Sequence, residues 1–192
     1  MRPIGRLVLL QVQRSTLKRG ERPNRVYDPA PLLPVPRAAV TPDGVLGLDR
    51  DAWVVDVHHR AHPLTKNEDG VHGVSVGFTG HYHAMAAQFG PRMTLGCAGE
   101  NLIAESAGRV RLADIASGLA ITAPDGSERV RLEVLKAAEP CRPFTGWALG
   151  GAVESAVMKE HLQFLFDGLR GFYLQALGSG VVEVGDLVQA IR

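Results

Sequence analysis

The pattern of apolar and polar positions along the chain predicts several short β-strands and two helices. In the strand candidates, apolar residues alternate with polar ones, or β-branched and aromatic residues follow one another. These candidates are residues 7–12, 53–57, 101–104, 119–122, 129–135, 172–177 and 181–191. Residues 119–135 are predicted to form a hairpin, because a turn containing Pro124 and Gly126 separates two of the runs.

Two segments have apolar residues at helical spacing. Residues 78–89 form one, which ends at Gly90 and Pro91, a typical helix stop. Residues 152–169 are the clearer helix, with apolar positions close to a period of 3.6. Six or seven short strands with two helices and many glycines predict a mainly β fold with α: a closed or half-closed β-barrel with two or more flanking helices. A doubly wound α/β sheet does not fit this order of elements.

Residues 23–42 hold six of the twelve prolines. Proline lacks the backbone donor and restricts the residue before it, so we expect neither helix nor central strand there. We interpret the segment at about residues 20–45 as an extended surface arm or loop, and a long insertion is favoured over a recognition arm. The length of 192 residues suits one domain, so residues 1–192 are predicted to form a single domain that includes this arm.

Charge and cysteine content narrow the classes of function. The 21 basic and 20 acidic residues give a net charge of +1, whereas a protein that neutralises nucleic-acid phosphates normally has a clearer basic excess. No run of 18 apolar residues exists, so we expect no transmembrane helix and no membrane partner. Cys97 and Cys141 are too few for a disulfide framework, which predicts a cytoplasmic protein with free thiols.

Cys141 is the strongest single candidate for chemistry. Pro140 and Pro143 fix the backbone around it, and Arg142 beside the thiol favours the thiolate, the form that attacks or binds metal. The alternative is an inert buried cysteine, because free cysteine is among the most buried residue types. Cys97 is interpreted as a small packed residue.

Histidines are concentrated in one region of the chain. Six of the seven lie there: His58, His59, His62, His72, His81 and His83. Neither HExxH nor paired CxxC is present, so we expect them to line a polar loop or pocket instead of a zinc site. The same region holds a GxSxG motif around Ser75, typical of hydrolases, but a predicted turn at residues 67–70 precedes it where a strand is required.

Four short motifs, taken in order, resemble the MOSC domain, the module named from the C-terminus of molybdenum cofactor sulfurases and also found alone in small bacterial proteins. They are Gly-Glu-Asn-Leu at 99–102, residues 132–134 followed by Pro-Cys-Arg-Pro-Phe at 140–144, Leu-Arg-Gly-Phe-Tyr at 169–173 and Val-Gly-Asp at 184–186. The resemblance runs from about residue 57 to residue 191. It implies a barrel that resembles the pyruvate-kinase β-barrel domain.

The resemblance also implies a molybdenum-pterin cofactor. Cys141 would either bind its molybdenum or carry sulfur as a persulfide, since a soft thiolate suits both. Arg142 and Arg170 would donate to the pterin phosphate, and Asn101 would bind a pterin edge or a substrate, with Glu100 orienting the loop. Turn capping is the alternative role for Glu100 and Asn101. The histidines expected at the mouth of the pocket include His58, His59, His72 and His81.

The activity that this resemblance implies is that of a small oxidoreductase that reduces N-hydroxylated compounds, or of a persulfide sulfur carrier. Expected partners are a small-molecule substrate, a sulfur donor or acceptor protein, or a redox partner. The alternative is a non-catalytic binding or regulatory module that has lost the cofactor. Cofactor sulfurases also contain a pyridoxal-phosphate domain, for which this chain is too short.

Overall fold

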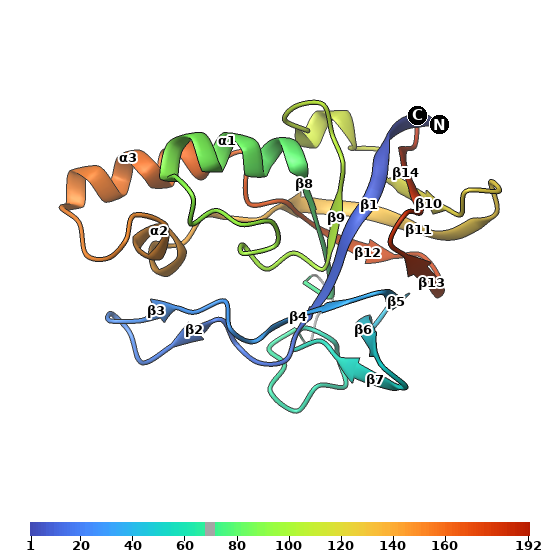
Figure 1. Cartoon of the computed structure of the whole chain (residues 1–192), viewed down its shortest axis with the longest axis horizontal. Coiled ribbons are helices and arrows are strands. Elements are labelled where there is room, and N and C mark those ends of the chain that lie inside the picture. Colours follow the sequence, from blue (N-terminus) through green and yellow to red (C-terminus); the bar gives the residue numbers. More distant parts are fainter. Residues whose placement is uncertain (68–71) are drawn as a thin grey trace.

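A closed barrel of seven strands forms the centre of the computed structural model, which describes residues 1–67 and 72–192 (Figure 1). Its strands are β1 (Arg2–Gln13), β8 (Val74–Phe78), β9 (Leu102–Ala104), β10 (Leu119–Thr122), β11 (Glu128–Ala137), β12 (Phe172–Ala176) and β14 (Leu187–Ala190). They follow the order β14-β10-β11-β12-β8-β9-β1, and antiparallel pairing of β1 with β14 closes the barrel. The predicted mainly β fold and the barrel are therefore confirmed.

Further strands extend the barrel on one side. A second sheet has the order β13-β5-β6-β7, and β4 pairs with the end of β1. The bounds are β4 (Leu32–Val35), β5 (Arg37–Thr41), β6 (Gly44–Asp49), β7 (Ala52–Val55) and β13 (Gly180–Glu183). A short hairpin, made of β2 (Lys18–Arg19) and β3 (Val26–Tyr27), projects away from both sheets (Figure 1).

The described part of the chain contains three α-helices, which gather on one side of the barrel (Figure 1). They are α1 (Thr79–Phe89), α2 (Arg142–Ala148) and α3 (Ser155–Leu165), and a 3₁₀ helix η1 (Leu112–Asp114) lies apart from them. Side chains alternate across the barrel wall: Leu102 of β9 faces the barrel core, whereas Ile103 faces a second apolar core beneath the helices. This second core also joins α2 to the hairpin, where the rings of Tyr27 and Phe144 meet edge to face at 5.1 Å.

Several predicted elements are confirmed, and others, including β8 and α2, were missed. The predicted helices correspond to α1 and α3, and the predicted hairpin corresponds to β10 and β11. Strand β8 was missed because all its residues are buried, so its sequence shows no alternation. Helix α2 was missed because two prolines flank its start, although proline is tolerated in a first turn. Most of the predicted turn at residues 67–70 lies outside the described residues.

The predicted surface arm at about residues 20–45 is wrong in its second half. Strands β4 and β5 and the start of β6 lie there, and β5 pairs on both sides, with β6 and β13. Proline has no backbone N–H to donate, and the prolines here occupy positions where the sheet needs none. Pro34 is on β4, at the edge of its sheet, and Pro36 and Pro42 flank β5. The segment supplies buried core residues, including Val40.

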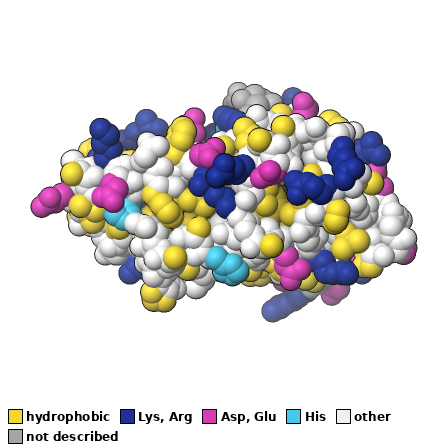
Figure 2. All heavy atoms as spheres, turned by 90° about the horizontal axis from the view of Figure 1, so that it is seen from above, with side chains coloured by type: hydrophobic (Ala, Val, Ile, Leu, Met, Phe, Trp, Pro, Cys, Tyr) yellow, Lys and Arg dark blue, Asp and Glu magenta, His cyan; other side chains and the backbone are white. Residues whose placement is uncertain are grey.

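Charged side chains of both signs are mixed over the face shown in Figure 2, with small apolar areas between them. This mixture agrees with the near balance of basic and acidic residues in the sequence. Within the described residues, every helix is too short or too polar to cross a membrane.

The corrected role of the proline-rich segment can be tested by truncating Val40, which is fully buried in β5. Val40→Ala should lower the free energy of unfolding by roughly 2 kcal/mol, because two methyl groups are lost and a cavity remains. Val26→Ala is the control, since Val26 is 60% exposed on the hairpin and should change stability by less than about 0.5 kcal/mol. Urea unfolding measures both, and equal effects would contradict the assignment.

Candidate functional site

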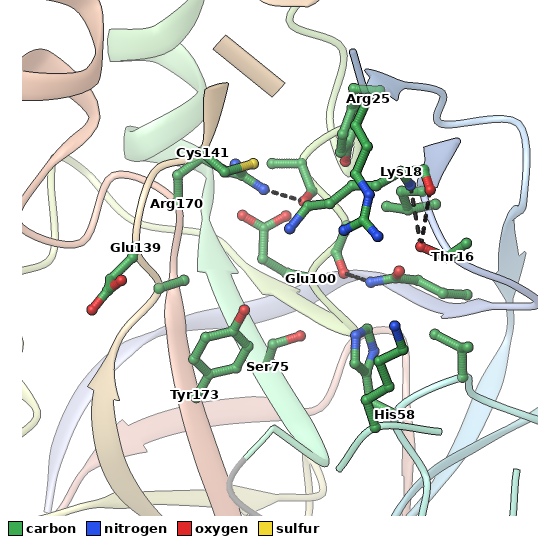
Figure 3. A pocket seen from close by; sticks show the side chains of 18 of the residues that line it. Thr16, Lys18, Arg25, His58, Ser75, Glu100, Glu139, Cys141, Arg170 and Tyr173 are labelled. Atoms are coloured by element: carbon green, nitrogen blue, oxygen red, sulfur yellow. Dashed lines mark hydrogen bonds between the residues drawn. The ribbon is translucent and has the colours of Figure 1, made fainter. Parts of the chain in front are cut away.

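A cavity of about 410 Å³ opens between the barrel, the hairpin and the start of α2 (Figure 3). Residues of the Gly-Glu-Asn-Leu, Pro-Cys and Leu-Arg-Gly-Phe-Tyr motifs line it together with residues from the N-terminal part of the chain. Its polar and charged lining consists of Gln13, Thr16, Lys18, Arg25, Tyr27, His58, Lys66, Ser75, Glu100, Glu139, Cys141, Arg170 and Tyr173. Its apolar lining consists of Leu17, Val57, Leu64, Ala98, Gly99 and Ala138.

Two glutamines of β1 hold the loop that precedes β9. Gln11 and Gln13 are two residues apart on a strand, so their side chains share a face. Gln11 Nε2 donates to the carbonyl of Gly96 and to that of Glu100, both at 2.8 Å, and Gln13 Nε2 donates to the carbonyl of Gly99 at 2.7 Å. Gly99 has φ +95°, and a Cβ there would lie 2.7 Å from Leu17 Cδ1. Backbone geometry therefore requires glycine at position 99, the first residue of the Gly-Glu-Asn-Leu motif.

Asn101 links this loop to three other parts of the chain. Its Oδ1 accepts from the backbone N–H of Ser75 at 3.1 Å and from the Ser75 hydroxyl at 2.9 Å. Its Nδ2 donates to Asp56 Oδ2 at 2.9 Å and to the carbonyl of Gln11 at 3.3 Å. Because the amide uses all its donors and acceptors inside the protein, the expected contact of Asn101 with a cofactor is replaced by a structural role.

Glu100 presents a carboxyl group to the cavity from a narrow slot. Its side chain is 3% exposed, and Oε2 accepts a short hydrogen bond from the hydroxyl of Tyr82 on α1. Oε1 is buried and has no hydrogen-bond partner among the described residues. The slot is lined by glycines, since a Cβ would lie 3.0 Å from Glu100 Oε1 at Gly77 and 3.0 Å from Glu100 Cγ at Gly171. Burial raises the pKa of Glu100, opposed in part by Arg170 and by the Tyr82 hydrogen bond.

Arg170 brings a positive charge into the same cavity. One guanidinium nitrogen, Nη2, donates to the carbonyl of Ala98 at 2.7 Å, and the group lies 3.7 Å from the centroid of the Phe144 ring. Its other nitrogens, Nε and Nη1, are buried without a partner in the described part of the chain. Buried polar groups are nearly always paired, so these donors are the kind of group that a ligand satisfies.

Cys141 is the thiol that faces this cavity. It is half-buried and directly precedes α2, where its carbonyl accepts from the backbone N–H and the hydroxyl of Thr145, both at 3.0 Å. Its sulfur points toward the space beside Arg170 (Figure 3). Cys97 differs: it is 4% exposed and outside the cavity lining, and burial raises the pKa of its thiol to about 12.

Of the histidines expected at the mouth of the pocket, His58 lines the cavity, with Nδ1 3.1 Å from Asp56 Oδ1. The ring of His72 packs edge to face on Tyr173 at 4.5 Å, behind the cavity wall. The expected placement is wrong for His72, which is outside the cavity lining, and for the other two histidines. His59 is buried away from the cavity, and burial lowers its pKa. His81 is fully buried beside Val110, and burial lowers its pKa to about 4.

The expected role of Arg142 is also corrected, because it is exposed at the start of α2 and outside the cavity lining. Lys18, Arg25 and Tyr173 also line the cavity, although they were not among the predicted site residues. No short motif marks the first two, since only tertiary packing brings the hairpin to the barrel. No group of three or more His, Cys, Asp or Glu residues in the described ranges is arranged to hold a metal ion.

The linking role of Asn101 predicts a large loss of stability on truncation. Asn101→Ala leaves buried groups of Ser75 and Gln11 without partners, which should cost about 3 kcal/mol. Asn24→Ala is the control, because Asn24 is exposed on the hairpin and should have little effect. Urea unfolding measures both, and a loss below about 1 kcal/mol for Asn101→Ala would contradict the role.

The raised pKa of Glu100 predicts how stability depends on pH. The unfolded chain releases this proton near the ordinary pKa of about 4.3, whereas the folded protein keeps it to higher pH. Wild type should therefore lose stability relative to Glu100→Gln as pH rises from about 4 through the raised pKa. Urea unfolding of both proteins across this range measures the difference. A relative gain by wild type with rising pH would show that the folded carboxyl favours its charged form.

Known structures share this fold at low sequence identity. The YuaD protein from Bacillus subtilis is 13% identical, with a TM-score of 0.59 over 100% of this chain and 98% of that one. YiiM from Geobacillus stearothermophilus is 14% identical, with a TM-score of 0.52 over 100% of this chain and 75% of that one. YiiM from Escherichia coli is 12% identical, with a TM-score of 0.51 over 83% and 65%. No curated protein matches the sequence with significance.

A family comparison gives the stronger assignment. The family model of the MOSC domain matches residues 71–189, which is more than half of the chain. The match includes the Gly-Glu-Asn-Leu motif, Cys141 and Arg170, all of which surround the cavity or support its wall. This chain therefore belongs to the MOSC domain family.

Proposed function

We propose that the cavity binds a molybdenum-pterin cofactor and that the Cys141 thiolate is a ligand of its molybdenum. The MOSC domain family is generally linked to this cofactor. The observation that carries the proposal is the shared position of three groups. The Cys141 sulfur, the unpartnered donors of Arg170 and the unpartnered carboxyl oxygen of Glu100 all belong to one cavity.

The described residues fit such a group. A thiolate is a soft ligand and suits a soft metal centre. Two buried donors on Arg170 and one buried carboxyl oxygen on Glu100 need polar partners, which a pterin or its phosphate supplies. The volume of about 410 Å³ falls in the usual range for cofactor sites, roughly 300–1,000 Å³. When bound, the molybdenum supplies a redox centre that exchanges electrons with a substrate.

The chain's own residues would bind and orient the ligands. Burial raises the pKa of Glu100, so its carboxyl group keeps a proton to higher pH than an exposed glutamate does. The Tyr173 hydroxyl points toward Glu100 from β12, and His58 lies on the opposite wall (Figure 3). Leu64 and Val57 add apolar surface to the lining beside these groups.

Of the activities considered, we favour a small oxidoreductase acting on N-hydroxylated compounds over a persulfide sulfur carrier. A sulfur carrier needs a thiol that a partner protein can reach. Cys141 is half-buried, and its sulfur points into a cavity lined by charged side chains. This arrangement suits a bound small molecule with anionic groups.

The cofactor proposal predicts an asymmetry between the two cysteines. Cys141→Ala, produced in a host that makes the cofactor, should lose most of the molybdenum and pterin that copurify with the wild type. Cys97→Ala is the matched control and should retain both, because Cys97 is outside the cavity lining. Metal analysis and pterin fluorescence measure the content, and thermal unfolding checks that both variants are folded.

Three results would contradict this proposal in different ways. Wild-type protein free of molybdenum and pterin would favour a binding or regulatory module that has lost the cofactor. Sulfane sulfur on Cys141, found by mass spectrometry without molybdenum, would favour the sulfur carrier. Equal molybdenum content in Cys141→Ala and wild type would remove Cys141 as the metal ligand.

A further inference from the structure

The four-stranded sheet of β13, β5, β6 and β7 has an apolar outer face. Side chains alternate between the two faces along each strand. Those of the inner face, including Ala38, Val40 and Val182, belong to the barrel core. Their neighbours along the strands point to the opposite face, and most of these are apolar as well. The apolar residues of this outer face are Ala39, Leu46, Leu48, Trp53, Val55 and Val181.

The strand register places these side chains next to one another. Residues directly opposite each other in an antiparallel pair lie on the same face. Ala39 of β5 lies opposite Val181 of β13 on one side and opposite Leu46 of β6 on the other. Leu46 in turn lies opposite Val55 of β7. One apolar row therefore crosses all four strands.

This face is accessible to solvent. Trp53 is 46% exposed and Val181 is 39% exposed, and the other four apolar residues are half-buried. Among the described residues, neither apolar core includes any of the six. An antiparallel sheet with one solvated face normally presents polar side chains there, and a continuous exposed apolar patch usually marks a binding surface. The described lining of the cavity includes none of the six, so this surface is separate from the proposed cofactor site.

The outer face has no net charge. Its two charged residues, Arg37 of β5 and Glu183 of β13, lie opposite each other in the register. They form an ion pair in which Arg37 Nε lies 3.1 Å from Glu183 Oε1. A strongly charged partner, such as a nucleic acid or an anionic membrane, finds no complementary charge on such a face. The chemistry that fits is a second surface that is also apolar and neutral.

We infer that the outer face binds the same face of a second copy of this chain, forming a two-fold symmetric dimer. A two-fold contact brings the same patch of both subunits together, so an apolar, neutral patch is matched by its own copy. The two sheets would pack face to face, as in a β-sandwich. The Arg37–Glu183 pair carries both signs and can therefore meet its own copy without net repulsion. Trp53 provides the residue type that is most enriched at the energetic centres of interfaces.

The size of the face limits the strength of this dimer. Strands about 4.8 Å apart, with about 3.4 Å per residue, give a four-stranded sheet of this length an area of roughly 300 Å². Leu177 and Val184, near the two ends of β13, are 64% and 51% exposed and widen the available apolar surface. A standard interface buries about 800 Å² on each partner. We therefore expect a weak, reversible dimer with a dissociation constant in the micromolar range.

Sedimentation velocity tests the dimer on full-length protein made in a host that lacks the molybdenum cofactor. Between about 1 and 500 µM, the wild type should shift reversibly from monomer to dimer, as mass action requires. Tryptophan fluorescence gives a second measurement. Its emission should move to longer wavelength on dilution, because the Trp53 ring returns to water when the dimer dissociates.

Two variants place a charge on the outer face. Trp53→Lys and Val181→Lys should each weaken dimerisation at least roughly tenfold, because an unpaired charge would be buried in an apolar contact. Val26→Lys is the matched control for Val181→Lys: Val26 is 60% exposed on the β2–β3 hairpin, outside this sheet, so dimerisation should stay within about twofold of the wild type. Thermal unfolding checks that all three variants fold.

Each other outcome overturns the inference. A wild type that remains monomeric up to about 500 µM would leave this face to a different protein. Dimerisation of Trp53→Lys and Val181→Lys at wild-type strength, or equal weakening by Val26→Lys, would place the contact elsewhere on the molecule. Because the protein tested contains no molybdenum, these results are independent of whether the cavity binds the cofactor.

Discussion

The site depends first on the buried hydrogen bonds of one amide, that of Asn101. These bonds join the loop before β9 to β1, to β8 and to the buried carboxylate of Asp56. Asp56 in turn accepts from the backbone N–H of Gln13 at 2.6 Å, so the end of β1 is held by the same group. In a low-dielectric interior, a network whose members are all paired fixes one geometry. The position of Glu100, the residue directly before Asn101, follows from it.

The groups that remain unpaired mark where this fixed geometry meets the cavity. A buried polar atom without a partner costs about 1–3 kcal/mol. Glu100 Oε1 and two nitrogens of Arg170 have this cost in the described structure, while the neighbouring Asn101 has none. Glycines at 77 and 171 make room for the Glu100 side chain, and Phe144 supports the guanidinium from beneath. The chain therefore maintains an acid and a cation beside the thiol of Cys141, which is an arrangement suited to a polar ligand.

The sequence predicted those parts of the molecule that depend on local pattern. Helix α3 and the β10–β11 hairpin follow from periodicity and turn chemistry. The Pro-Cys and Gly-Glu-Asn-Leu motifs contain Cys141 and Glu100, which line the same cavity. Proline content misled the prediction for β5, because the prolines flank the strand and leave its hydrogen-bonding positions free. His81 was misplaced for a related reason: the sequence gives its helix but not which face of that helix is buried.

Other parts of the site depend on contacts between distant segments, which a single sequence does not reveal. Lys18 and Arg25 face Cys141 only because the hairpin packs on α2 through Tyr27 and Phe144. Asn101 belongs to the Gly-Glu-Asn-Leu motif, yet its role is structural. That role follows from the four hydrogen bonds of its side-chain amide, which the sequence does not reveal. The Gly-Glu-Asn-Leu motif thus indicated that the loop before β9 belongs to the site, but not the role of each residue in that loop.

We propose that one cavity, bounded by Cys141, Glu100 and Arg170, holds the cofactor. The most direct measurement is anomalous X-ray diffraction at the molybdenum absorption edge, on crystals of protein whose molybdenum content has been established by metal analysis. We expect a single strong anomalous peak inside this cavity, beside the Cys141 sulfur. A peak elsewhere on the molecule, or none in crystals of molybdenum-containing protein, would contradict it.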